Sequence, residues 1–263
     1  MPSVAYDSLS KRYDLLQDES NPRLIATRVS SLISRYGPPG GDGDRGALIV
    51  CDLGCGTGST MLELSRNGYD MIGVDCSAGM LSVAQKAFLR EGREALLICQ
   101  DISHLDLFGT VDVFLSLTDT LNHLTDIRAF RRLFSSMRNF LNPGGLFIFD
   151  MLTLHFLSEV RGNHQYQNVE EEYALFWDNR FVKRTAVSRS DMTFFSRNED
   201  ETYDRSDFTI SERYYSEKQV REVLKLGNLE LVGVFGDYRD ARPGRSDVRH
   251  LYVARRLKEE RSI

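Results

Sequence analysis

Apolar residues follow two successive patterns along the chain, and the change between them divides the sequence. Residues 6–36 carry apolar positions at helix-like spacing, so this segment is predicted to be helical. The sequence GPPGGDGDRG (37–46) then stops any helix. From residue 47 onward, short apolar runs alternate with amphipathic segments. The predicted strands are 47–52, 71–75, 95–99, 111–116 and 146–151, and the predicted helices between them are 58–67, 78–91 and 126–141.

The predicted strands are continuous apolar runs rather than alternating ones. Such runs indicate strands that are buried on both faces, as in a parallel sheet covered by helices. Units of this kind have right-handed crossovers and build a doubly wound sheet. We therefore predict an α/β fold in which ligands bind beyond the carboxyl ends of the strands.

Residues 166–214 break this rhythm, because they are rich in Tyr, Phe, Thr and Val with partial alternation. The pattern predicts three antiparallel strands inserted late in the domain as a β cap. Phe176, Trp177 and Phe181 either pack this extra sheet or form an aromatic wall for a ligand. A helix (216–227) and two strands (229–238 and 248–256) are predicted to follow. We expect four parts: a helical lid and linker at 1–44, a core at 45–165, the cap at 166–214, and the elements completing the core at 215–263.

Composition narrows the class of partner. The chain has 263 residues and a formal net charge of −5, which argues against nucleic acid as a main partner. The N-terminus shows no signal peptide, and no apolar stretch is long enough to cross a bilayer, so a cytoplasmic protein without membrane contact is expected. The cysteines lack a C-x-x-C pair, so we expect reduced thiols and no metal. They are Cys51, Cys55, Cys76 and Cys99.

The sequence VCDLGCGTG (50–58) is the strongest chemical signal. Gly54, Gly56 and Gly58 follow a buried strand and open a helix. Glycines at such a turn allow a ligand to approach the backbone amides and allow unusual backbone angles. Asp52 ends the strand, where its carboxylate either meets a cationic group of the ligand or accepts hydrogen bonds from the loop itself.

Two further carboxylates follow the next two strands. Asp75 ends the second strand and is placed to accept both ribose hydroxyls of an adenosine. Asp101 follows the third strand, where it is placed to accept the exocyclic amine of adenine while Ile102 packs on the ring. Met80 is placed to contact the other face. The alternatives are that both aspartates are helix N-caps and that Met80 is ordinary core.

These motifs, together with an NPGG turn (142–145) and FIFD (147–150), resemble the ordered motifs of class I S-adenosylmethionine-dependent methyltransferases over residues 45–160. The resemblance implies a mostly parallel seven-stranded sheet whose last strand, 248–256, is antiparallel. It also implies S-adenosylmethionine as cofactor and S-adenosylhomocysteine as product. The implied contacts are Gly54, Gly56 and Gly58 to the methionine portion, Asp75 to the ribose, and Asp101 and Ile102 to adenine.

The segment LSLTDTLNHLTD (115–126) is similar to the corresponding segment of small-molecule N-methyltransferases, including glycine and amino-sugar types. By this likeness Leu117 lines the cofactor, and His123 is a candidate base or orienting group. The alternative is that His123 hydrogen-bonds locally and caps a turn beside Asn122.

The lead-in YDSLSKRYD (6–14) resembles the same group, in which a tyrosine such as Tyr13 reaches over the cofactor. Tyr13 is a candidate for a cation–π contact to the sulfonium, or it packs an amphipathic helix.

The predicted function is in-line methyl transfer to a nitrogen or oxygen of a small-molecule acceptor. One alternative is a non-catalytic methyltransferase-like binding or assembly protein, against which Asp52, Asp75 and Asp101 argue. The other is a nicotinamide-dependent oxidoreductase, which the glycine spacing and Asp101 disfavour. A homodimer is left open.

Overall fold

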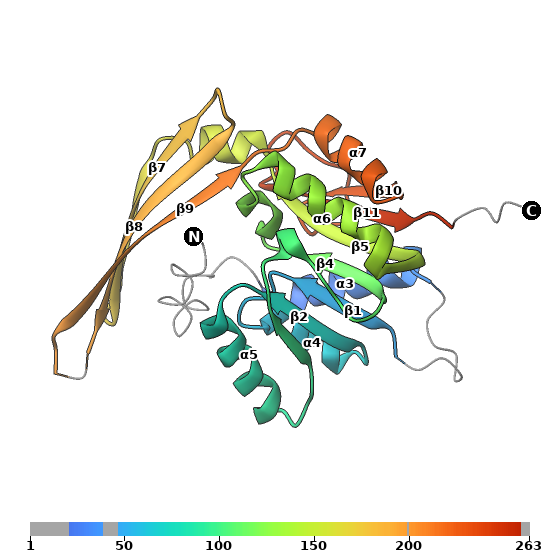
Figure 1. Ribbon diagram of the computed structural model, residues 1–263. Coiled ribbons are helices and arrows are strands. Elements are labelled where there is room, and N and C mark those ends of the chain that lie inside the picture. The colour runs from blue at the N-terminus through green and yellow to red at the C-terminus, as the bar shows by residue number, and fades with distance from the viewer. Residues whose placement is uncertain (1–20, 39–46, 199, 259–263) are drawn as a thin grey trace, which may run out of the picture.

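The computed structural model describes residues 21–38, 47–198 and 200–258 (Figure 1). Helix α3 (Pro22–Tyr36) begins after Asn21, whose side chain accepts the amide of Leu24 at 3.1 Å. It ends at Gly37, whose amide donates to the Ile33 carbonyl at 2.7 Å. The part of the predicted helix 6–36 that precedes residue 21 lies outside the described residues, as does most of the linker 37–46.

A seven-stranded sheet forms the centre of the molecule, with the strand order β10-β11-β5-β4-β1-β2-β3. All neighbouring pairs from β5 to β3 are parallel, whereas β11 is antiparallel to both β5 and β10. The predicted doubly wound sheet with an antiparallel last strand is confirmed. Its strands are β1 (Ile49–Leu53), β2 (Asp70–Asp75), β3 (Leu96–Cys99), β4 (Val111–Ser116), β5 (Leu141–Leu152), β10 (Leu229–Gly236) and β11 (Arg249–Arg256).

Helices cover both faces of this sheet, because each strand turns alternate apolar side chains to opposite sides. One face packs α3, α4 (Ser59–Arg66) and α5 (Ala78–Arg90), and the other packs α6 (Ile127–Phe140) and α7 (Glu217–Leu226). On the second face, the rings of Phe130 and Tyr215 stack at 4.0 Å between centroids. No helix in the described part of the chain is long and apolar enough to cross a membrane.

Strand β5 begins earlier than the predicted strand 146–151. It starts at Leu141, and the pairing with β4 shifts register between Val111 and Val113. The shift in register leaves room for the NPGG sequence (142–145) within the paired strand. The sequence prediction had left these residues out of the strand because they favour turns.

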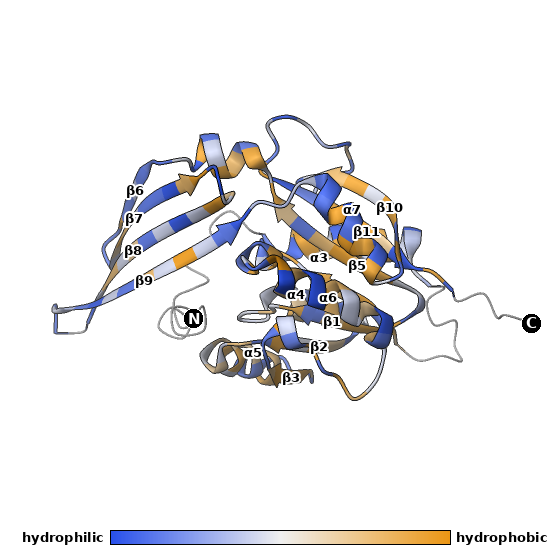
Figure 2. Ribbon diagram, turned by 45° about the horizontal axis from the view of Figure 1, so that its top comes forward, coloured by the Kyte–Doolittle hydropathy of each residue, from blue (hydrophilic) through white to orange (hydrophobic). Residues whose placement is uncertain are grey.

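A second sheet, here called the arm, extends away from the central sheet in both views (Figures 1 and 2). The arm has four antiparallel strands, so the prediction of three strands is wrong by one. The missed strand, QYQNV, is exposed throughout and has no apolar alternation to reveal it. The arm strands are β6 (Gln165–Val169), β7 (Tyr173–Val182), β8 (Val187–Arg197) and β9 (Tyr203–Arg213). A π-helical turn, η3 (Phe156–Val160), precedes them.

The two faces of the arm differ in composition. Trp177, Met192 and Phe208 lie in one cross-strand row, and Phe208 shares its face of β9 with Glu212 because residues four apart on a strand point the same way. Phe181 belongs to this face as well, since it pairs through Ser188 with Glu212. Phe176 points to the opposite face and is 40% exposed.

Candidate active site

The carboxyl ends of β1, β2, β3 and β4 surround a cleft of about 690 Å³. Parallel strands end at the same edge of a sheet, so residues that are distant in sequence meet there. Nine of the residues predicted from the sequence line this cleft. They are Asp52, Gly54, Gly56, Asp75, Met80, Asp101, Ile102, Leu117 and His123. Tyr13 lies outside the described residues.

The glycines of the turn after β1 have two different roles: some line the cleft, and one allows two helices to pack closely. Gly56 has a φ of +55°, and a Cβ there would meet nothing within 4 Å, so the space above it is open. Gly54 lines the cleft too, although a Cβ there would collide with Thr120. Gly58 was expected to line the same cavity, but the structure places it elsewhere. Its φ is +76°, and a Cβ would stand 3.0 Å from that of Ala84 on α5, so Gly58 allows two helices to pack.

Asp75 holds the glycine turn in place. One carboxylate oxygen accepts the Gly56 amide at 2.9 Å, and the other accepts the Ser77 amide at 2.8 Å. Asp75 also lines the cleft, so its carboxylate is an acceptor at the edge of the space where a ligand would lie. Asp75 is not the N-cap of α5, because Ser77 fills that position and accepts the Met80 amide.

Asp101 is both a helix N-cap and an accessible carboxylate in the cleft, which the sequence analysis had treated as alternatives. It caps the short helix η1 (Ile102–His104) by accepting the Ser103 amide at 2.8 Å. Its side chain is nevertheless 61% exposed and lines the cleft. One oxygen therefore serves the cap while the carboxylate stays accessible to a ligand.

Asp52 is the most enclosed carboxylate of the cleft, with only 5% of its surface exposed. Burial is the largest cause that raises its pKa, and together with the charges of Asp75 and Asp150 it brings the pKa to about 7. An ionised Asp52 is therefore costly unless a cation lies nearby. The deepest part of the cleft is electrostatically suited to a positively charged ligand group.

The turn after β4 has an unusual backbone. Thr118 and Asp119 have φ values of +51° and +61°, which non-glycine residues rarely adopt. Asp150, fully buried at the end of β5, accepts both of their amides at 2.8 Å. Tyr238 and Arg249 also donate to Asp150. These contacts hold the turn in a strained shape beside the cleft.

His123 ends the short helix η2 (Thr120–His123) and faces the cleft. The neighbouring Asn122 fixes this helix, because its amide donates to the Arg213 carbonyl at 2.9 Å and its oxygen accepts the Leu152 amide at 3.1 Å. The imidazole is hydrogen-bonded to the backbone of Ser211 on the arm. Burial is the largest influence on His123 and lowers its pKa, which favours the neutral ring.

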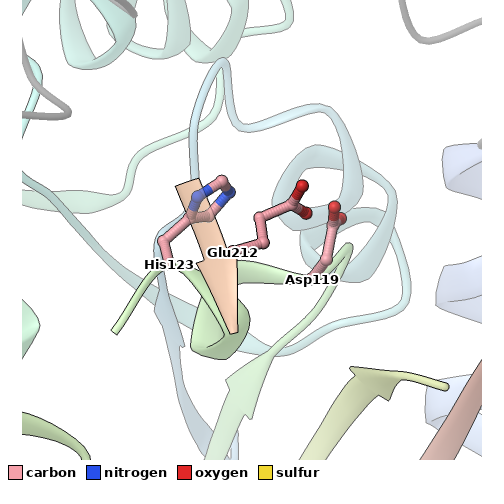
Figure 3. Close-up of side chains that lie close together, drawn as sticks. All are labelled: Asp119, His123 and Glu212. Atoms are coloured by element: carbon pink, nitrogen blue, oxygen red, sulfur yellow. The ribbon is translucent and has the colours of Figure 1, made fainter. Parts of the chain in front are cut away.

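Sequence reasoning missed two residues that stand next to His123. Asp119 and Glu212 each place a carboxylate oxygen within 4.8 Å of a ring nitrogen of His123 and of one another (Figure 3). Burial and the charge of Glu212 raise the pKa of Asp119 well above its usual range. Asp119 is close to His123 in sequence, so proximity was a usable signal. Glu212 belongs to the arm, and no motif or spacing connects it with this site.

Comparisons with known proteins agree with this geometry. Residues 50–145 match a family model described as a methyltransferase domain. A relative from Geobacillus sp. (strain WCH70), whose name assigns it to the methyltransferases, is 25% identical over 253 residues, which cover 96% of this chain and 100% of the relative. The crystal structure of an S-adenosylmethionine-dependent methyltransferase from Clostridium acetobutylicum has a TM-score of 0.84 at 26% identity, covering 97% of this chain and 100% of that chain. The sugar N-methyltransferase KedS8 from Streptoalloteichus sp. shares the fold, with a TM-score of 0.73 at 19% identity, covering 94% of this chain and 93% of that chain.

Proposed function

Because this chain is a class I S-adenosylmethionine-dependent methyltransferase, we propose that it transfers the methyl group to a nitrogen or oxygen atom of a small-molecule acceptor. The observation that carries this proposal is the single cleft shared by three successive strand ends. The open space above Gly56 and the carboxylates of Asp75 and Asp101 lie along one cavity.

Each part of the proposed cofactor has a chemically suitable partner in the cleft. Asp75 has lone pairs for the ribose hydroxyls, and Asp101 has an accessible carboxylate for the adenine amine, with Ile102 and Met80 as apolar neighbours for the ring. The methionine portion fits beside Gly54 and Gly56, where a side chain would obstruct it. Asp52 supplies the negative charge that a cationic cofactor requires.

The acceptor side of the cleft is proposed to lie where the turn after β4 meets the arm. Leu117 and His123 line this end, and the face of the arm that carries Trp177 continues from Glu212 beside His123. The shared fold with a sugar N-methyltransferase is compatible with a small amine or hydroxyl compound as acceptor.

The chemistry needs little from the protein beyond alignment. S-adenosylmethionine supplies a methyl group on a sulfonium, which is already a good leaving group. Holding an acceptor in line with that methyl group contributes about 7–11 kcal/mol in well-oriented systems. His123 is proposed to orient the acceptor or to take its proton, since a neutral imidazole can do either.

Calorimetry with S-adenosylmethionine and S-adenosylhomocysteine is the first test, followed by mass spectrometry of products from a panel of amines and hydroxyl compounds. We expect both ligands to bind and one class of compound to gain a methyl group. His123→Ala should lower turnover far more than it lowers cofactor affinity, with Asp75→Ala as a variant that loses the cofactor. Lack of binding of either ligand would favour the non-catalytic alternative, and thermal protection by NAD would favour the oxidoreductase.

A further inference from the structure

Three side chains from separate elements converge at the base of the arm. Asp119 and His123 follow β4, and Glu212 comes from β9, yet one nitrogen or oxygen atom of each lies within 4.8 Å of the other two. Figure 3 shows the Glu212 carboxylate directed toward that of Asp119, with the imidazole alongside. Ionised carboxylates only accept hydrogen bonds. Two of them facing each other repel unless positive charge lies beside or between them, and Arg161 and Arg249 lie beside this pair.

Glu212 is the member that most clearly points to a ligand. It is 2% exposed, and when Asp119 is ionised its Oε1 atom has no hydrogen-bond donor among the described residues. A protonated Asp119 would instead donate to the Glu212 carboxylate. Its other oxygen, Oε2, is paired with Arg161. A buried carboxylate oxygen without a donor costs free energy, so such atoms in folded proteins normally have a partner.

The three side chains also have the outer contacts that fix metal ligands in proteins. A metal-binding histidine usually donates its other ring N–H to a backbone carbonyl or carboxylate, and a metal-binding carboxylate is itself hydrogen-bonded. Here the imidazole is hydrogen-bonded to the backbone of Ser211, and Arg161 holds Oε2 of Glu212. Arg249 lies 3.8 Å from a carboxylate oxygen of Asp119.

We propose that Asp119, His123 and Glu212 form a binding site for a divalent transition-metal ion. One imidazole nitrogen and two carboxylate oxygens are a ligand set that suits Mn²⁺ or Zn²⁺ better than Mg²⁺, which prefers oxygen atoms alone. The expectation of no metal came from the cysteines. It addressed thiolate zinc sites and did not consider this combination of ligands.

A site with three protein ligands leaves coordination positions open to water or to a substrate atom. His123 faces the cleft, so an open position on the acceptor side would bring an acceptor oxygen or nitrogen to the ion. In this arrangement His123 is an orienting residue and does not take the proton. The proposed methyl transfer does not itself require the ion, so the two proposals can fail separately.

The test uses the full chain, first treated with a chelator and then dialysed against Mn²⁺ or Zn²⁺, with metal content measured by elemental mass spectrometry. We expect about one ion per chain, and Mn²⁺ should give an electron paramagnetic resonance signal of a protein-bound ion. Glu212→Gln and Asp119→Asn should each weaken Mn²⁺ binding at least about tenfold. Glu172→Gln, an exposed arm carboxylate, is the matched control and should bind normally.

Each outcome of this experiment is decisive, because circular dichroism reports separately whether the wild-type chain or a variant is folded. If a folded wild-type chain binds neither ion, or if Glu212→Gln binds Mn²⁺ as tightly as the wild type does, the metal site is refuted. The cluster then holds a shared proton. If Glu212→Gln fails to fold, His123→Ala replaces it, with the same loss of Mn²⁺ binding expected. Methyl transfer that persists without bound metal leaves the proposed function intact.

Discussion

The carboxylate of Asp150 accepts the backbone amide of Asp119 at 2.8 Å, which fixes the strained turn after β4 from the end of the neighbouring strand. The second oxygen of Asp150 accepts the Thr118 amide at the same distance. Both turn residues have positive φ values, so the turn depends on these bonds to keep its shape. Asp150 therefore fixes the backbone that places His123 at the cleft and Asp119 beside Glu212 of the arm.

Replacing Asp150 with Asn should destabilise the fold. One acceptor oxygen becomes an NH₂ group facing a backbone N–H, and a buried donor left without an acceptor costs about 1–3 kcal/mol. Urea unfolding followed by circular dichroism measures the loss. Asp204→Asn, an exposed aspartate on β9, should change stability little. Equal unfolding midpoints for the two variants would show that Asp150 does not hold the turn.

Substitutions at two glycines with positive φ allow the effect of backbone strain to be measured apart from the effect on ligand binding. Gly56 and Gly68 have φ values of +55° and +91°, and a Cβ at either position would meet nothing within 4 Å. Each change to Ala should therefore cost a similar free energy of unfolding, about 1 kcal/mol. Only Gly56→Ala places a methyl group in the cleft, so only this variant should lose affinity for S-adenosylmethionine in calorimetry. An unchanged affinity would move the cofactor away from the glycine turn.

The sequence predicted those parts of the fold and site that depend on local patterns. Asp52, Asp75 and Asp101 each end or follow an apolar strand, and parallel topology alone brings such residues to one edge. Gly58 follows the same motif, but its role depends on how closely α4 approaches α5, which spacing does not report. Glu212 was not predictable, because its position depends on how the arm joins the core.

Binding of S-adenosylmethionine should depend on pH through Asp52. The folded, ligand-free protein raises the pKa of Asp52 to about 7, so Asp52 is mostly protonated at pH 6 and mostly ionised at pH 8. If the sulfonium cofactor binds only when Asp52 is ionised, the affinity for S-adenosylmethionine should be about tenfold higher at pH 8 than at pH 6. Calorimetry at both values measures this change. Asp52→Asn should bind weakly and without that dependence. A wild-type affinity that is equal at both values would remove Asp52 from cofactor binding.

The same raised pKa predicts the opposite effect on stability without ligand. A carboxyl group whose pKa is higher in the folded state binds its proton more tightly there than in the unfolded state. The free energy of unfolding is therefore highest at low pH, and it falls as pH rises from the unfolded pKa toward 7. The Asp52→Asn variant has no buried charge at this position, so it should melt at a higher temperature than the wild type at pH 8. Differential scanning calorimetry measures the two melting temperatures. A lower melting temperature at pH 8 would mean that the ionised Asp52 stabilises the apo fold.

Trp177 tests whether the arm contributes to acceptor binding. Its ring stacks on Tyr166 with centroids 5.4 Å apart, and its row on the sheet shares a face with Glu212, which lies beside His123. Once an acceptor is known, Trp177→Ala should raise its KM roughly fivefold or more, because a lost aromatic contact is worth about 1 kcal/mol or more. Affinity for S-adenosylmethionine should not change, since Trp177 does not line the cleft. Phe176→Ala, on the opposite face, is the matched control. If both variants keep the wild-type KM, the aromatic residues serve only to pack the arm.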